Sequence, residues 1–144
     1  MALYDHKQCT LILNGHEINS FDESSDCISV THNADAGAFT VGANGRGVFV
    51  ANGDESGTLT IKVMQHSADN EFLSSLLNQQ RNAIKSFIPI EMHLKDVLNG
   101  DEITGMKGFF TTVPPYTRGT AHNSTTWIIV FERMAMDLKR GIFN

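Results

Sequence analysis

The sequence predicts a mainly β protein, a β-sandwich or barrel of about seven to eight strands with one flanking α-helix. Short segments of alternating apolar and polar residues, separated by Asn-Gly and Gly-rich turns, recur along most of the chain. One segment has the helical spacing of apolar residues instead. The 144 residues fit one domain, so we expect residues 1–144 to form a single unit.

The first half of the chain contains five predicted strands. They cover residues 8–13, 16–20, 27–32, 47–51 and 58–65. Asn14-Gly15 separates the first two and is a strong hairpin-turn signal. The fifth alternates cleanly, with Leu59, Ile61 and Val63 on one face, as half-buried strands do.

One helix is predicted over residues 68–82. Ser67 is a good N-cap residue, and Asp69 and Glu71 place negative charge in the first turn, where the helix dipole favours it. Arg81 places a cation near the helix end. The apolar stripe of this helix consists of Phe72, Leu73, Leu76 and Leu77.

Three strands are predicted after the helix, over residues 87–94, 102–113 and 124–133. Gly105 and Gly108 indicate bends or bulges in the second. The third carries apolar residues on both faces, with Trp127 and Ile129 alternating with Ile128. Both faces are therefore expected to be covered, either by the helix or by another subunit.

Composition and charge exclude several classes of protein. The formal net charge of −5 leaves no basic footprint for nucleic acid. The first residues lack the basic and apolar regions of a signal peptide, and the chain lacks an apolar run of about 18 residues, so we expect no membrane association. Cys9 and Cys27 are expected to be reduced and partly buried, as free cysteines usually are. A disulfide between them is the alternative, although a chain of this size does not require one.

No catalytic constellation is visible. The six histidines are well separated, and none has a ligand spacing typical of a metal site. The GANGRG segment at residues 42–47 lacks the lysine-serine pair of a phosphate-binding loop and leads into a strand rather than a helix. The acidic pairs at residues 54–55 and 101–102 lie in turns, where solvated carboxylates are common. We therefore expect no enzymatic activity, no cofactor and no metal.

The most unusual feature is the stretch from residue 33 to residue 46, which is long, rich in glycine and predicted to be a loop between strands. Loops longer than about 12–15 residues without structure of their own are uncommon and usually functional. An ordinary flexible hairpin tip is the alternative.

Taken in order, these features resemble a tail tube protein of contractile-tailed bacteriophages, a family related in fold to the type VI secretion tube protein. ILNGHEINSFDESSDCISVTHN resembles the opening hairpin of that family. SGTLTIKVMQHSADNEFLSSL resembles its centre and is the most specific part. VPPYTRGTAHNSTTWIIVFERMAMDL resembles its end, where a proline pair precedes a tryptophan strand. The resemblance covers residues from about 11 to 137.

This resemblance implies a structural protein of the virion tail that assembles in the host cytoplasm. Six copies would form a ring in which a sheet from each subunit joins one continuous inner barrel. Stacked rings would form a hollow tube for the passage of double-stranded DNA, without specific binding. The implied partners are other copies of the chain, the tail sheath protein, and tape-measure and baseplate proteins.

The resemblance also assigns candidate sites. The loop at residues 33–46 would reach the adjacent ring and would be held loosely until it docks. Its contact candidates are Ala36, Gly37, Phe39, Val41, Gly42, Asn44 and Arg46. An acidic lumen would let DNA slide, because DNA is densely negative. The lumen candidates are Glu91, Asp96 and Glu102.

Two other functions remain compatible with the sequence. A baseplate protein, a tube-initiating ring protein or the tube of another contractile injection system would share the fold. A small β-barrel binding module or enzyme is the alternative from a different class, and a stable monomer with a stoichiometric ligand would favour it.

Overall fold

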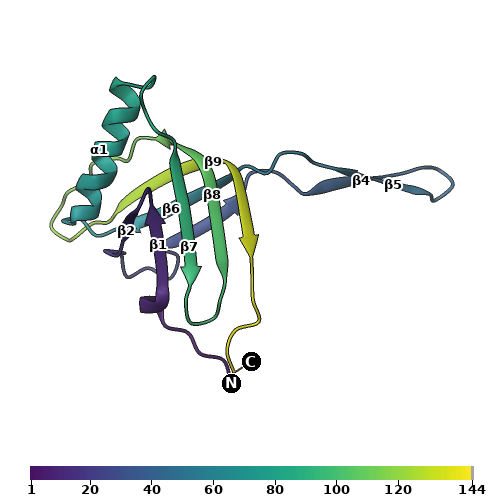
Figure 1. Cartoon of the computed structure of the whole chain (residues 1–144), viewed down its shortest axis with the longest axis horizontal. Coiled ribbons are helices and arrows are strands. Elements are labelled where there is room, and N and C mark those ends of the chain that lie inside the picture. Colours follow the sequence, from purple (N-terminus) through teal and green to yellow (C-terminus); the bar gives the residue numbers. More distant parts are fainter. Residues whose placement is uncertain (144) are drawn as a thin grey trace.

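A computed structural model describes residues 1–143 of the chain and has the mainly β fold that the sequence predicts, with one α-helix in the described part. Seven strands form one antiparallel sheet in the order β2-β1-β7-β8-β9-β6-β3, and β4 pairs with β5 in a separate two-stranded sheet (Figure 1). The elements, in chain order, are η1 (His6–Gln8), β1 (Cys9–Leu13), β2 (His16–Ile18), β3 (Ile28–His32), β4 (Gly37–Val41), β5 (Gly47–Ala51), β6 (Gly57–Val63), α1 (Ala68–Asn82), β7 (Ile90–Asp96), β8 (Glu102–Thr112) and β9 (Thr125–Asp137).

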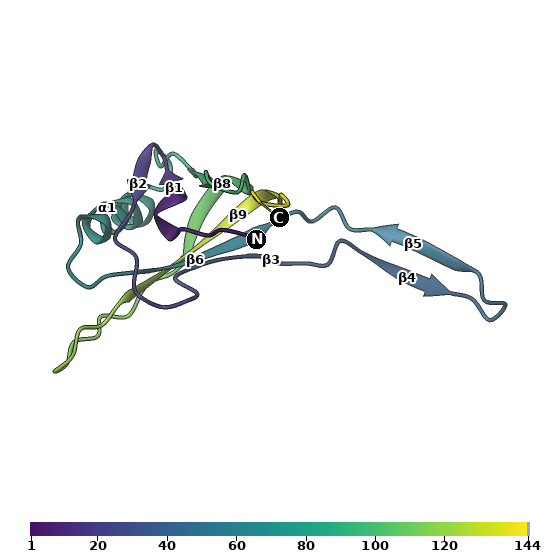
Figure 2. The ribbon, with the colours of Figure 1, turned by 90° about the horizontal axis from the view of Figure 1, so that it is seen from below.

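The large sheet curls around α1, which lies between β1–β2 and β6–β9 in Figure 2. One face of the sheet therefore forms the core together with the apolar stripe of the helix, and Leu73 and Leu77 are buried there. The largest fully buried side chains are Phe131, Leu11, Leu13, Ile18, Leu59, Ile61, Leu73, Ile90, Ile129 and Val63. Among residues 1–143, no helix is both long and apolar enough to cross a membrane.

Gly105 and Gly108 allow the sheet to bend, as predicted. The Phe131 side chain of β9 lies directly over both glycines, and a Cβ atom on Gly105 would come within 2.9 Å of its ring. Lys107, between them, has a positive φ of 56°, and the register between β7 and β8 shifts at this point. A bulge of this kind increases local twist. The large ring therefore fills the space that the two glycines leave.

Polar contacts fix α1 on the sheet. The helix begins at the predicted N-cap, Ser67, whose hydroxyl accepts the backbone N–H of Asp69 at 3.0 Å. The side chain of Gln80 makes two hydrogen bonds to the backbone of Phe110, of 2.8 and 2.9 Å. The indole N–H of Trp127 donates to Asn70 at 3.0 Å. The helix is thus joined to β8 and β9 near both of its ends.

Asp69 is the one buried charged residue in the described part of the chain. Its carboxylate lies 2.9 Å from Nε2 of His16 and accepts the backbone N–H groups of Asn19 and Ser20, each at 3.0 Å. Burial alone would raise the pKa of this carboxyl, but these hydrogen bonds outweigh burial and hold the pKa below its ordinary value. Asp69 thereby ties the segment after β2 to the start of the helix.

Most strand ends agree with the predicted ones to within two residues, and larger differences occur in three places. The predicted loop at residues 33–46 is wrong in part, because it contains the strand β4. β7 begins at Ile90, directly after Pro89, whereas the predicted strand began at residue 87. β9 continues to Asp137, four residues beyond the predicted end. The expectation of two covered faces in β9 is met only in part, since Ile128 and Val130 are half-buried.

Candidate functional site

The most conspicuous feature of the molecule is an arm, residues 33–56, that projects away from the body between β3 and β6 (Figures 1 and 2). Its core is the antiparallel pair of β4 and β5, in which Gly37 pairs with Ala51 and Val41 pairs with Gly47. The two strands continue the direction of the β3–β6 ladder. The long connection noted in the sequence is therefore mostly an extended β-ribbon rather than a loop.

A tight turn closes the tip of the arm. The N–H of Gly45 donates to the carbonyl oxygen of Gly42 at 2.9 Å, and the N–H of Gly42 donates to that of Arg46, also at 2.9 Å. Gly45 has a φ of +82°, a conformation that glycine adopts without strain. The side chain of Asn44 accepts the N–H of Arg46 at 3.2 Å. These contacts explain why this asparagine and these glycines occupy the tip.

An aromatic pair organises one face of the ribbon. The rings of Phe39 and Phe49 lie on facing residues of β4 and β5 with their centroids 5.2 Å apart. The Phe49 ring also lies across Gly37, where an added Cβ would collide with that ring and come within 2.7 Å of the Val50 carbonyl oxygen. Gly37 is thus required for packing rather than for an unusual backbone conformation.

The arm exposes apolar side chains on both faces. The register places Phe39, Val41 and Phe49 on one face and Val48 and Val50 on the other. The exposed fractions of these five side chains are 75, 64, 54, 61 and 59%, respectively. An isolated two-stranded ribbon is marginally stable in water, and exposed apolar strands readily pair with other chains. The arm therefore has the physical character of a surface that is covered in an assembly.

The base of the arm is anchored to the body. Asn33 bonds to Ser56 through both its backbone and its side chain, and its side-chain oxygen accepts the hydroxyl of Thr58 at 2.6 Å. Across the base, Glu55 pairs with Arg133 at 2.9 Å, and its carbonyl oxygen accepts the backbone N–H of Met134. These contacts fix where the arm leaves the sheet.

The predicted contact candidates all lie on the arm, but only on its first strand and its tip. Gly37, Phe39 and Val41 belong to β4, Ala36 precedes it, and the turn contains the others, Gly42, Asn44 and Arg46. Sequence reasoning missed the apolar side chains of β5 as part of the same surface. The run Val48-Phe49-Val50 was the available signal, because three consecutive apolar residues place such residues on both faces of a strand.

The three lumen candidates do not share a face of the sheet. Glu91 lies between the buried Ile90 and Met92 and so points away from the core. Glu102 lies on that same outer face, opposite Lys95, and its carboxylate is 2.8 Å from Nε2 of His93.

Asp96 instead pairs with Cys9 of β1 and borders a pocket on the inner face. Its carboxylate accepts the backbone N–H groups of Leu98 and Asn99 at 3.1 Å each, which stabilises the turn before β8.

Clusters of metal ligands and reactive thiols are two further kinds of site that could carry chemistry in the described part of the chain. No group of three or more potential metal ligands occurs among residues 1–143. Cys9 and Cys27 are both free thiols, and burial raises the pKa of each. The hydrogen bond between the Tyr4 hydroxyl and the Cys9 sulfur is the first cause that raises the pKa of Tyr4, to about 12. Raised thiol pKa values make these cysteines poor nucleophiles at neutral pH.

Comparison with known proteins points to phage tails. A family model described as "Bacteriophage PhiTE tail tube protein" matches residues 13–139. No curated protein sequence is significantly similar to the chain. Solved structures share its fold at low sequence identity.

A chain of the "Virion of native gene transfer agent (GTA) particle" has a TM-score of 0.59 at 10% identity, covering 94% of this chain and 99% of that one. A chain of an extracellular contractile injection system, from the structure of the "PVC sheath/tube terminator in extended state", also has a TM-score of 0.59 at 10% identity, with 95 and 98% covered. The "anti-feeding prophage cap (AFP tube terminating cap)" has a TM-score of 0.53 at 12% identity, with 96 and 93% covered.

Proposed function

We propose that this chain, which belongs to the family of the bacteriophage PhiTE tail tube protein, is the repeating subunit of a phage tail tube. The family match and the shared fold support a structural role in a virion tail. The observation that carries the proposal is the arm, which offers two apolar faces that its own body leaves uncovered. A subunit with this shape gains stability by packing against copies of itself.

In the proposed assembly, six subunits form a ring and rings stack into a hollow tube. The large sheet supports ring formation because its edge strands, β2 and β3, each pair on one side only within residues 1–143. Open edges are liabilities that closure across subunits removes. The arm then reaches the next ring, with Phe39 and Phe49 as its central contacts and the apolar residues of β5 as additional ones.

The tube would conduct double-stranded DNA without binding it specifically. We propose that Glu91 and Glu102 face the lumen, where acidic side chains repel the phosphate backbone. Asp96 is a weaker candidate, because it lies on the opposite face and its carboxylate supports a turn. The proposal includes a sheath protein outside the tube, tape-measure and baseplate proteins as further partners, assembly in the host cytoplasm, and no catalysis or cofactor.

A second candidate function is a ring that starts or ends the tube. It is favoured by the fold shared with chains from two structures, one of a "sheath/tube terminator" and one of a "tube terminating cap". The two functions differ in one property, since a tube subunit stacks repeatedly on itself whereas a terminating ring stops growth. The difference is visible in the length of the assemblies that the pure protein forms.

Negative-stain electron microscopy of the concentrated, purified protein tests the proposal. Hollow tubes with six-fold end views are the expected result. Single rings that never lengthen would favour the terminating or initiating ring. A monomer at every concentration that binds a small molecule stoichiometrically would contradict both functions and favour a β-barrel binding module.

A further inference from the structure

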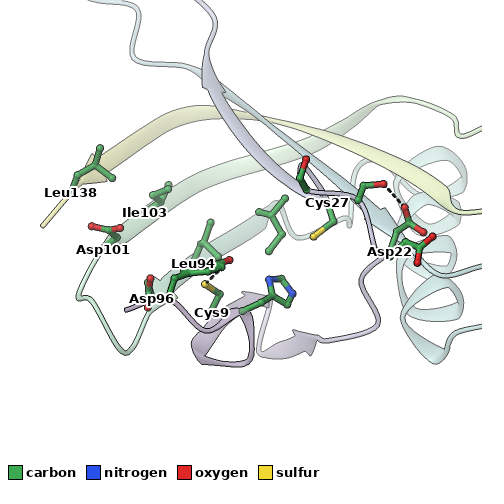
Figure 3. A pocket seen from close by; sticks show the side chains of 14 residues that line it. Cys9, Asp22, Cys27, Leu94, Asp96, Asp101, Ile103 and Leu138 are labelled. Carbon is green, nitrogen blue, oxygen red and sulfur yellow. Dashed lines mark hydrogen bonds between the residues drawn. The ribbon is translucent and has the colours of Figure 1, made fainter. Parts of the chain in front are cut away.

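A pocket with a volume of about 600 Å³ opens on the inner face of the sheet, near the chain termini. Figure 3 shows it between the segment that carries Asp22 and Cys27 and the strands β7 and β8, which carry Leu94 and Ile103. We call it the inner pocket. It is lined by Tyr4, His6, Cys9, Asp22, Glu23, Ser24, Ser25, Cys27, Ile28, Leu94, Asp96, Asp101, Ile103 and Leu138.

The inner pocket exists because α1 covers only part of the concave face. The helix packs over Phe110 and Trp127, whereas Leu94, Ile103 and Ile28 lie beyond it and are only half-buried. Leu138 borders the same space and is 64% exposed. These side chains keep part of their apolar surface in water, so a second apolar surface placed there would add burial.

The polar groups around the pocket are strongly biased toward negative charge. Its lining includes four carboxylates and, among the described residues, no lysine or arginine. Three of the carboxylates already accept hydrogen bonds within the chain: Asp22 from Ser24, Asp96 from a turn, and Asp101 from the backbone of Lys139. Glu23 is exposed at the rim.

The arm has the complementary composition. Arg46, at its tip, is the one charged residue between Asp35 and Asp54. Behind the tip follow the exposed side chains of Phe39, Val41 and Val48. The arm extends away from its own body in both views, so it does not lie in the pocket of the same chain (Figures 1 and 2).

We propose that the inner pocket is the receptor for the arm of a second copy of this chain, with the apolar tip of the arm against Leu94, Ile103 and Ile28 and with Arg46 paired to Glu23. This inference rests on the proposed tube function, and it names the surface of the neighbouring subunit that receives the arm. Arm and pocket are different surfaces, so the contact is heterologous. Each copy that receives an arm in its pocket can still dock its own arm on another copy. Such contacts form rings or open filaments.

A charge exchange tests the pairing. Arg46→Glu should raise the protein concentration needed for assembly about tenfold or more, because it places like charges together. Adding Glu23→Lys should restore assembly to within about threefold of the unaltered protein. The matched control is Arg46→Glu with Glu71→Lys, which reverses an exposed carboxylate on α1, outside the pocket and away from the sheet edges, and should restore nothing. Sedimentation of assembled material measures all four proteins.

Thiol protection tests occupancy of the pocket independently of charge. In a Cys27→Ser background, alkylation of Cys9 should be at least about tenfold slower in assembled protein than in free subunits, because the docked arm covers the thiol. The reaction is run at mildly alkaline pH, since burial raises the pKa of Cys9.

Equal alkylation rates would overturn the inference, as would equal rescue by Glu71→Lys and Glu23→Lys. Either result would leave the tube function standing if the unaltered protein still forms tubes. Absence of tubes from the unaltered protein would instead contradict the proposed function itself.

Discussion

β5 and β6 follow one another along the chain and both are rich in apolar residues, but β5 lies in the arm and β6 in the body, and their surroundings differ completely. The three apolar residues of β6 alternate with polar ones and are 0% exposed. Val48, Phe49 and Val50 of β5 follow one another directly and are 61, 54 and 59% exposed. Alternation matches a sheet with one buried face, whereas a continuous run supplies both faces of a strand. In the arm, the chain itself buries neither face.

The comparison suggests that the body and the arm have different roles. Residues of the body, represented by β6, determine whether the subunit folds. Residues of the arm, represented by β5 and β4, determine whether folded subunits assemble. Substitutions in the two regions should therefore separate stability from assembly, and the following predictions are ordered by the size of their expected effect on stability.

Truncation in β6 should have the largest effect on folding. Leu59 is fully buried in the centre of the core, so Leu59→Ala should lower the free energy of unfolding by about 2–5 kcal/mol. The matched truncation in β5, Val50→Ala, should change it by less than about 0.5 kcal/mol. Denaturant unfolding of the free subunit measures both values. A comparable loss of unfolding free energy in the two variants would contradict the separate roles of body and arm.

Removing the charge of Asp69 should have the next largest effect. Asp69→Asn weakens three contacts in a buried site and should destabilise the free subunit by about 1–3 kcal/mol at neutral pH. The arm should be unaffected, because these contacts lie at the helix N-terminus. Chemical denaturation at pH 7 provides the value.

The same carboxyl should produce a pH dependence of defined sign. The pKa of Asp69 is lower in the folded chain than its ordinary value of 3.8, so the unfolded chain binds a proton first as the pH falls. The stabilising contribution is present above pH 3.8 and is lost as the pH falls through the lower folded-state value. Asp69→Asn should make the free energy of unfolding depend less on pH in this acidic range. An unchanged pH dependence would contradict the role given to the Asp69 carboxyl.

The smallest effect on stability, and a large one on assembly, is expected from Gly37→Ala. The added methyl group would collide with the ring of Phe49, which would distort the arm while leaving the core intact. Gly47→Ala is a matched control on the facing strand, because its nearest neighbours there are 3.8 Å away. Melting temperatures of both variants should match that of the unaltered protein. Only Gly37→Ala should impair sedimentable assembly, and equal assembly by both would contradict the role of the Phe49 contact.

The body of the protein could be predicted well because local signals and tertiary contacts agree there. Ser67, Asp69 and the leucine stripe specify α1 with its observed bounds, and Asn14-Gly15 specifies the first hairpin turn. The strand β4 was not predicted, because its pairing with β5 cannot be inferred from residues 33–46 alone. Only the pairing of Phe39 with Phe49 across the turn reveals that residues 37–41 are extended.

The inner pocket could not be found from the sequence, because it depends on how far α1 reaches over the curled sheet. Cys9, Glu23 and Ile103 are distant along the chain and meet only in the fold. The sequence likewise did not indicate on which face of the sheet Asp96 lies. It follows from the strand register with β1, which no local pattern predicts.

Removal of the whole arm tests the central claim most directly. Deleting only residues 36–44 would leave β5 without its partner, so the better variant lacks residues 36–52 and joins Asp35 to Gly53 through an Asn-Gly turn. The deletion should leave a subunit that unfolds cooperatively, with the stability of the unaltered chain, and that forms no tubes under the electron microscope. Tubes from the armless subunit, or a subunit that no longer folds, would contradict the claim that the arm serves assembly and the body serves folding.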